Sequence, residues 1–66
     1  MKKIYTLLVA ESNRSKVESI FNTFRIGMND WDVSKVFEVN GLRVINYTIM
    51  CDEETYTSIV NILNRD

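Results

Sequence analysis

An Asn-Gly pair at residues 40 and 41 constrains the fold of this chain more than any other feature of its sequence. The pair lies between two runs of strand-forming residues, 31–39 and 42–51. In this setting Asn-Gly is the strongest short-range signal for a β-hairpin, because both residues tolerate the positive φ angles of a tight turn. We therefore expect 31–39 and 42–51 to form two paired antiparallel strands.

Two turn geometries fit this pair, and they place different side chains on the two faces of the sheet. A two-residue loop would pair Val39 with Leu42 and leave both faces of mixed polarity. A three-residue loop closed by a glycine bulge would instead pair Glu38 with Leu42. A shift of one residue moves every side chain of a strand to the other face, so the pattern of apolar residues should select the register.

The bulged turn separates apolar from polar side chains more cleanly, and we favour it for that reason. Its apolar face would carry Trp31, Val33, Phe37, Ile45, Tyr47, Ile49 and Cys51. Its other face would carry Asp32, Ser34, Val36, Glu38, Leu42, Val44, Asn46, Thr48 and Met50. The large aromatic residues would then lie under the helices. In the other arrangement they would form an open surface on which RNA bases could stack.

The rest of the chain predicts one strand and two helices. Residues 4–10 are nearly all apolar, as in a strand that is covered on both sides or paired at both edges. An apolar stripe with helical spacing predicts a helix over about 14–26, with Gly27 as its left-handed C-terminal residue. A second stripe follows the N-cap candidate Asp52 and predicts the last helix. The stripes consist of Val17, Ile20, Phe21 and Phe24, and of Tyr56, Ile59, Val60 and Leu63.

These elements give the order β-α-β-β-α in a single α+β domain over residues 1–66. A right-handed crossover leaves room for the third strand between the first two. We therefore expect a three-stranded antiparallel sheet of order 1-3-2, with both helices on the face that carries Trp31 and Tyr47. This arrangement resembles a ferredoxin-like fold that lacks its last strand. The resemblance covers the order of elements along the whole chain and no sequence motif.

The composition removes several kinds of chemistry. The chain has 66 residues, no histidine and one cysteine, Cys51. An intramolecular disulfide is excluded, a structural zinc site lacks ligands, and a serine or cysteine nucleophile lacks its usual base. We predict no catalytic residues, no metal and no cofactor. A lone cysteine is typical of a reducing compartment, so we expect a cytoplasmic protein without a membrane segment.

The charges are nearly balanced and dispersed. Eight basic and nine acidic residues give a net charge of −1, and no basic run is present. This pattern argues against non-specific nucleic-acid binding. Arg14, Arg43 and Arg65 are expected near the start of the first helix, where they could hold an anion. The plainer alternative is three solvated arginines.

Two surfaces remain uncovered in the predicted fold. The first strand would be a bare apolar edge, through Tyr5, Leu7 and Val9. Such an edge predicts a homodimer joined strand to strand, or another protein that adds a strand there. The open face of the sheet would carry an apolar group formed by Val36, Leu42, Val44 and Met50, of which we expect the first three to be contact residues.

These surfaces favour a small non-enzymatic protein that acts by stoichiometric contact, blocking or modulating another protein. Short chains of this kind are typical of phage and mobile-element accessory proteins that inhibit or modulate a host protein. The alternative is a regulatory module that binds nucleic acid or a small ligand.

Overall fold

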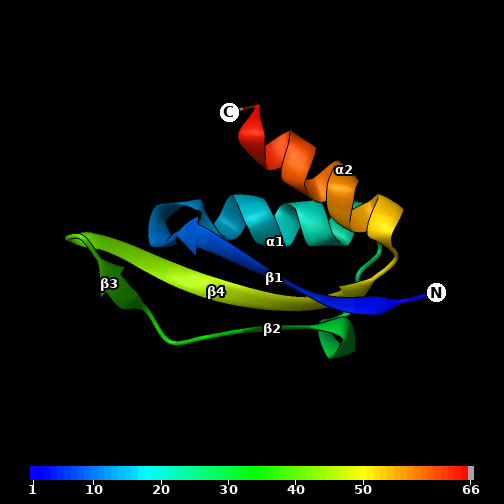
Figure 1. Cartoon of the computed structure of the whole chain (residues 1–66), viewed down its shortest axis with the longest axis horizontal. Coiled ribbons are helices and arrows are strands. Elements are labelled where there is room, and N and C mark those ends of the chain that lie inside the picture. Colours follow the sequence, from blue (N-terminus) through cyan, green and yellow to red (C-terminus); the bar gives the residue numbers. More distant parts are fainter. Residues whose placement is uncertain (66) are drawn as a thin grey trace.

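A four-stranded antiparallel sheet with two helices on one of its faces forms the structure, a computed structural model that describes residues 1–65 (Figure 1). The long strand β4 (Leu42–Cys51) pairs with β1 (Lys3–Ala10) on one side. On its other side it pairs with β2 (Trp31–Val33) and β3 (Phe37–Val39). The predicted sheet has three strands in the order 1-3-2, whereas the structure has four and the order β1-β4-β2, because the run 31–39 is interrupted.

The turn at the tip of the hairpin is the two-residue form. Val39 pairs with Leu42, and Phe37 pairs with Val44. Asn40 has a φ of 52° and Gly41 a φ of 83°, as a tight primed turn requires at both central positions. The predicted three-residue turn is therefore wrong.

The extra residue that we predicted at the turn lies between β2 and β3 instead. In β2, Val33 pairs with Tyr47, and the amide of Ser34 donates to the carbonyl of Asn46 at 2.9 Å. Phe37 already pairs with Val44, so Lys35 and Val36 together lie opposite Ile45. Two residues opposite one define a β-bulge, and this bulge shifts the register between β2 and β3 by one residue.

The bulge reconciles the two-residue turn with a clean apolar face. Trp31 and Val33 keep the predicted face, because β2 has the register that the three-residue turn would have given. Beyond the bulge the faces are exchanged relative to our prediction. Phe37 lies on the same face as Val44, while Val36 packs against the core. The predicted positions of Phe37 and Val36 are therefore wrong.

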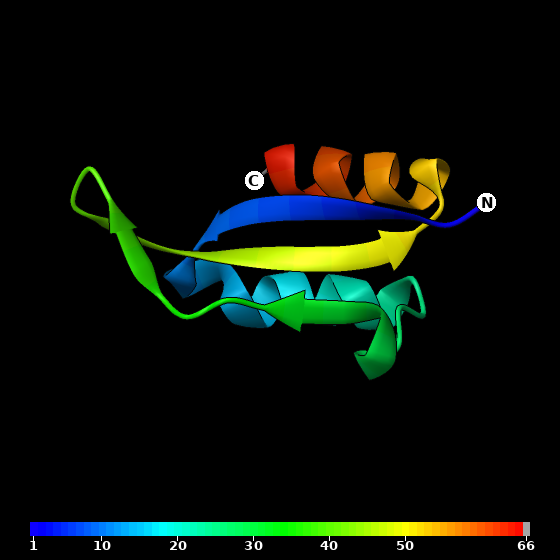
Figure 2. The ribbon, with the colours of Figure 1, turned by 60° about the horizontal axis from the view of Figure 1, so that its bottom comes forward.

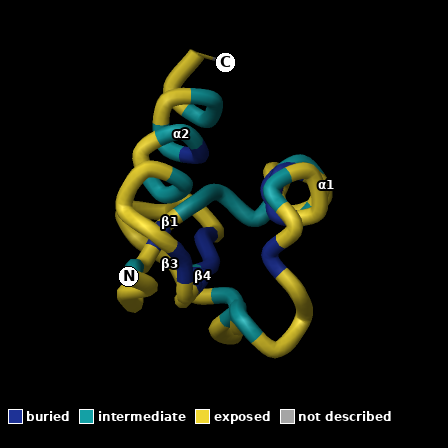
Figure 3. The backbone as a smooth tube through the Cα atoms, turned by 90° about the vertical axis from the view of Figure 1, so that its right-hand side faces the viewer, coloured by how far each residue is buried: buried dark blue, intermediate teal, exposed yellow. Residues whose placement is uncertain are grey.

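Both helices lie on the same side of the sheet (Figures 1 and 3). A short 3-10 turn, η1 (Glu11–Asn13), leads into helix α1 (Arg14–Thr23), and α2 (Glu53–Asn64) follows β4. Asp52 occupies the N-cap position of α2 but makes no side-chain capping bond. Its carboxylate lies 3.3 Å from the N-terminal amino group.

Helix α1 ends earlier than predicted, at a residue other than glycine. Arg25 has a φ of 58°, whereas Gly27 has a φ of −71°. The amide of Ile26 donates to the carbonyl of Phe21, and that of Arg25 donates to Asn22, which together form a Schellman motif. The motif places Ile26 beside Phe21 in the core, and this packing explains why the helix stops here. Our assignment of Gly27 as the left-handed residue is wrong.

The core lies between the helices and the sheet. Phe21 of α1 packs edge to face against Tyr47 at a centroid distance of 5.3 Å. Trp31 completes this aromatic cluster, 5.6 Å from Phe21 and 5.7 Å from Tyr47. The buried cluster consists of Leu7, Val17, Ile20, Phe21, Ile26, Ile45, Tyr47, Ile49, Cys51 and Ile59.

Candidate functional site

The side of the sheet that faces away from the helices carries an apolar patch. Large apolar side chains exposed in the structure are found at eight positions, and two of these, Met1 and Met28, lie outside the sheet. The other six share one face, as the strand registers show. We call these six the open-face patch: Ile4, Leu8, Phe37, Val39, Leu42 and Met50. In Figure 1 the helices lie above the sheet and this open face lies below.

Three strands contribute to the open-face patch. Pairing of Lys3 with Cys51 directs the even-numbered residues of β1 to the open face, together with the even-numbered residues of β4. The bulge adds β3, whose Phe37 lies beside Val44. Ala10 flanks Val44 on its other side, so this valine is only 4% exposed although it lies on the open face. Val44 is thus a buried residue within the open face, between strands β1 and β3.

The open-face patch has two apolar ends with a polar belt between them. Ile4, which is 70% exposed, pairs with Met50 at the end near the N-terminus. Leu8, 58% exposed, belongs to the other end, with Phe37 and the residues around the turn. The belt between the two ends consists of Thr6, Thr48 and Asn46. A shallow cavity of about 160 Å³ lies at the Ile4 end and is lined in part by Thr48 and Met50.

Only part of the predicted contact surface lies on the open face. Leu42 is there and is exposed. Tyr5, Leu7 and Val9 lie on the helix side instead, where Leu7 is buried and the other two pack against the core. Val36 also packs against the core. Residues 4–10 are apolar at nearly every position, so they lack the alternation that would have shown which side chains face outward.

Most of the open-face patch was not predicted from the sequence. The exposed members of β1 are Ile4 and Leu8, and only pairing with the alternating strand β4 places them there. Met50 was assigned to the open face in the predicted register, but it was not included among the contact residues. Met50 and Asn46 are separated by an even number of residues on a strand whose side chains alternate between faces, so they share a face. This spacing was the available signal.

Helix α2 partly covers the free edge of β1. The hydroxyl of Tyr56 donates to the backbone carbonyl of Thr6 at 3.3 Å. The ring of Tyr56 also stacks on that of Tyr5, with 4.2 Å between centroids. Farther along β1 an open groove of about 450 Å³ separates Leu8 and Val9 from α2. The β1 edge is therefore less bare than predicted.

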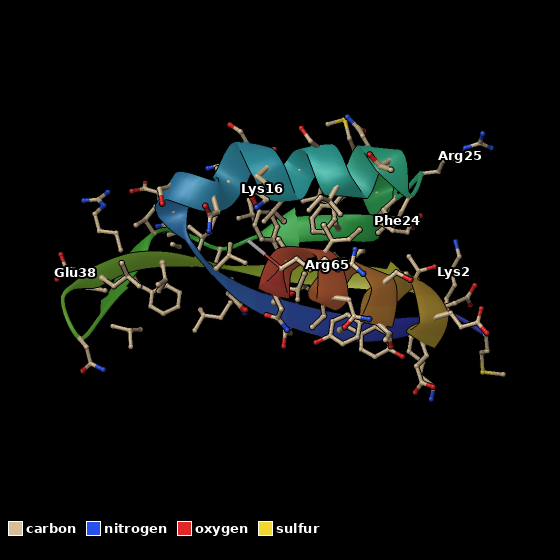
Figure 4. All side chains as sticks on the ribbon, turned by 90° about the horizontal axis from the view of Figure 1, so that it is seen from above. Lys2, Lys16, Phe24, Arg25, Glu38 and Arg65 are labelled. Atoms are coloured by element: carbon tan, nitrogen blue, oxygen red, sulfur yellow. The ribbon has the colours of Figure 1, made fainter. Side chains whose placement is uncertain are left out.

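The predicted anion site does not form one cluster of free arginines. Arg14 Nε donates to Glu18 Oε2 at 2.9 Å, and Arg43 Nε donates to Glu11 Oε1 at the same distance. The hydrogen bond and charge of Glu11 raise the pKa of Arg43. Arg65 lies at the end of α2, well apart from the hairpin tip that carries Glu38 (Figure 4). Two of the three guanidinium groups thus already have carboxylate partners.

Two buried groups are tuned by their surroundings without forming a reactive site. Burial, and then the hydrogen bond that its hydroxyl donates to Glu18 at 2.7 Å, raise the pKa of Tyr47. Burial and the charge of Asp52 raise the pKa of Cys51, which keeps its thiol protonated and poorly nucleophilic. Within residues 1–65 no three His, Cys, Asp or Glu side chains gather as they would around a metal ion.

We found no family model, no curated protein and no solved structure that matches this chain. No helix within residues 1–65 is both long enough and apolar enough to cross a membrane. The surfaces described above are therefore the basis for a functional assignment.

Proposed function

We propose that this protein is a small non-enzymatic binding protein that acts by stoichiometric contact with another protein through its open-face patch. The observation that supports this proposal is that six exposed large apolar side chains share one face of the sheet. Exposed apolar side chains gathered on one face, as at each end of the open-face patch, often mark a contact site. Inhibition or modulation of a host protein, as by a phage or mobile-element accessory protein, needs only such a surface.

The chemistry of the open face favours a protein over a nucleic acid as the partner. Phe37 is the aromatic member of the open-face patch, whereas Trp31 and Tyr47 lie in the core cluster on the other side of the sheet. Base stacking needs several exposed rings, and the open-face patch offers one. A nucleic-acid-binding or small-ligand-binding regulatory module remains the second proposal.

A non-catalytic role is part of the same proposal. The chain contains no histidine, and its one thiol is buried with a raised pKa. We also retain the proposed likeness to a ferredoxin-like fold without its last strand. In that reading β2 and β3 form one strand that the bulge interrupts, beside the central β4.

Capture experiments with two matched variants test the proposed function. The tagged chain is incubated with a lysate of the cells that produce it, beside the variants Leu42→Lys and Ser19→Lys. Leu42 belongs to the open-face patch, whereas Ser19 is an exposed residue of α1 on the helix side. We expect the unmodified chain and Ser19→Lys to retain a protein in equal molar amount, and Leu42→Lys to lose it.

Besides failure to capture any protein, two results would contradict the proposed function. One is retention of the same protein by Leu42→Lys at the level of the unmodified chain. The other is tight binding of a nucleic acid in low salt that weakens steeply as salt is added, which would favour the second proposal.

A further inference from the structure

We infer that the open-face patch binds a second copy of this chain, face to face, so that two sheets stack between two outer layers of helices. This inference rests on the proposed function, because both require the open-face patch to be a contact surface. It names the partner that covers this surface when the protein is alone in solution. It also replaces the dimer joined through the β1 edge that the sequence analysis predicted.

The size of the open-face patch fits a stable dimer. A fully exposed large apolar residue presents about 200 Å². On that scale, the exposed fractions of the six patch residues amount to about 600 Å² of apolar surface. Homodimer interfaces are about 65% apolar, so a patch of this size with its polar surroundings would bury about 900 Å² per copy. The total of about 1,800 Å² lies within the range of stable protein interfaces.

The whole surface of one copy is larger than that of a typical monomer. The chain exposes 4874 Å² and has a mass of 7.7 kDa. A monomeric protein of that mass is expected to expose about 4,300 Å². The excess of about 500 Å² is close to the area of the open-face patch. This excess is more than half of the roughly 900 Å² that a second copy would cover on each chain, so the chain has surplus surface for such a contact.

The polar belt of the open face is compatible with its own copy. A face-to-face dimer with two-fold symmetry brings the centre of each sheet onto the centre of the other. That centre carries Thr6, Thr48 and Asn46. Hydroxyl and amide groups both donate and accept hydrogen bonds, so they can pair with their own equivalents. A belt of charged groups of one sign would instead repel the same belt of the second copy. Asp32, the charged neighbour of Thr48, lies on the edge strand β2 and therefore at the rim of the contact.

The packing geometry needs no change in the fold. Two sheets stack about 10 Å apart when the side chains of their facing surfaces interdigitate. The two apolar ends of the open face flank the belt. A two-fold axis that lies between the sheets, whether parallel or perpendicular to the strands, therefore places apolar surface on apolar surface. The β1 edge is less available for a dimer contact, because the hydroxyl of Tyr56 in α2 already donates a hydrogen bond to the carbonyl of Thr6.

Substitutions on the central strand separate a face contact from an edge contact. Leu42 and Met50 both lie on β4, at opposite ends of the open-face patch, and β4 is paired on both sides. Replacing both residues by lysine should therefore abolish a face-to-face dimer and leave a dimer joined through the β1 edge unaffected. Light scattering on the purified full chain, from micromolar to submillimolar concentration, gives the mass directly.

We expect the unmodified chain to approach twice its 7.7 kDa mass, with dissociation at the lowest concentrations. The double variant L42K/M50K should remain at the mass of one chain, with a dissociation constant raised at least about a hundredfold. Ser19→Lys, which adds the same charge on the helix side, should dimerise like the unmodified chain. The near-ultraviolet signal of the Trp31 and Tyr47 cluster shows whether each variant is folded. If the lysine variant is unfolded, the milder pair L42T/M50T should weaken the dimer about tenfold.

Two outcomes would overturn the inference. A single-chain mass at every concentration would exclude the second copy, and a dimer that survives in folded L42K/M50K would place the contact elsewhere. The proposed function fails independently. A chain that stays monomeric but loses capture of another protein on Leu42→Lys would refute only the inference. A face-to-face dimer that captures no other protein would support the inference and contradict the proposed function.

Discussion

At the scale of single residues, the structure departs from the sequence pattern where packing in the core overrides the local backbone preference of a residue. Arg25 is the clearest case. A left-handed backbone costs a residue with a Cβ atom about 1–2 kcal/mol, and glycine avoids this cost. The chain has Gly27 two residues later, yet the left-handed position is Arg25, because that places Ile26 against Phe21.

Replacing Arg25 by glycine should therefore stabilise the protein. We expect Arg25→Gly to raise the free energy of unfolding by about 1 kcal/mol, measured by urea denaturation. The matched control is Arg25→Ala, which removes the same charge but retains the Cβ atom, and it should bring no gain. Equal stabilisation by glycine and alanine would show that the backbone at this position is not strained.

Tyr47 provides a second prediction at the residue scale. Its hydroxyl is buried and donates to the carboxylate of Glu18, so Tyr47→Phe should lower the free energy of unfolding by about 2 kcal/mol at neutral pH. As a control, Tyr56→Phe removes an exposed hydroxyl with a 3.3 Å bond and should cost only a few tenths of a kcal/mol, by about the usual scale for surface groups. Equal costs for the two variants would contradict the buried bond.

The same pair predicts a pH dependence. The pKa of Tyr47 is raised above its ordinary value of 10.0, so the folded state holds the phenolic proton more tightly than the unfolded state. The resulting stabilisation is complete below pH 10.0 and is lost as the pH rises above it. The stability difference between the unmodified chain and Tyr47→Phe should shrink by up to about 1.4 kcal/mol per pH unit in this range. A constant difference would rule out this linkage.

At the scale of secondary-structure elements, the bulge between β2 and β3 decides the shape of the hairpin. The tight turn and the apolar pattern demand registers that differ by one residue. Placing Lys35 and Val36 opposite Ile45 satisfies both, and it leaves the charge of Lys35 exposed. The extra residue is thus accommodated where a lysine can reach water.

This reading predicts that Lys35 can be deleted. Without it, Ser34 to Val39 would pair with Leu42 to Asn46 one for one, and every side chain would keep its present face. The free energy of unfolding should change by less than about 0.5 kcal/mol in urea denaturation. Deletion of Glu38 is the matched control, because it also removes one charged residue but would turn Lys35 toward the core face and Val36 away from it. It should cost more than about 2 kcal/mol, and equal effects of the two deletions would refute the bulge.

At the scale of the whole molecule, a chain of 66 residues has little interior to bury. The structure is elongated, with extents of 36 × 24 × 17 Å, and β3 at the hairpin tip is exposed throughout (Figure 2). Helices cover one face of the sheet only. A second copy on the open face would add an apolar layer between the two sheets, so the proposed dimer should melt at a temperature that rises with protein concentration.

Local sequence patterns were sufficient to predict the elements whose apolar residues recur with a clear period. The alternation in 42–51 predicted that Ile45, Tyr47, Ile49 and Cys51 face the core, but not that Val44 is buried on the open face. The helical stripes predicted α1 and α2. Asn40 and Gly41 located the hairpin. These signals are local, because each is contained in the period of one element or in the backbone freedom of two residues.

The side chains that form the candidate site depend on how the strands pair. The β1 run has apolar side chains on both faces, so pairing with β4 alone directs Ile4 and Leu8 outward and Leu7 inward. The placement of the extra residue at Lys35, which brings Phe37 to the open face, depends on the turn and the core together. The open-face patch is thus a product of strand register, a long-range property that a residue's neighbours in the sequence do not encode.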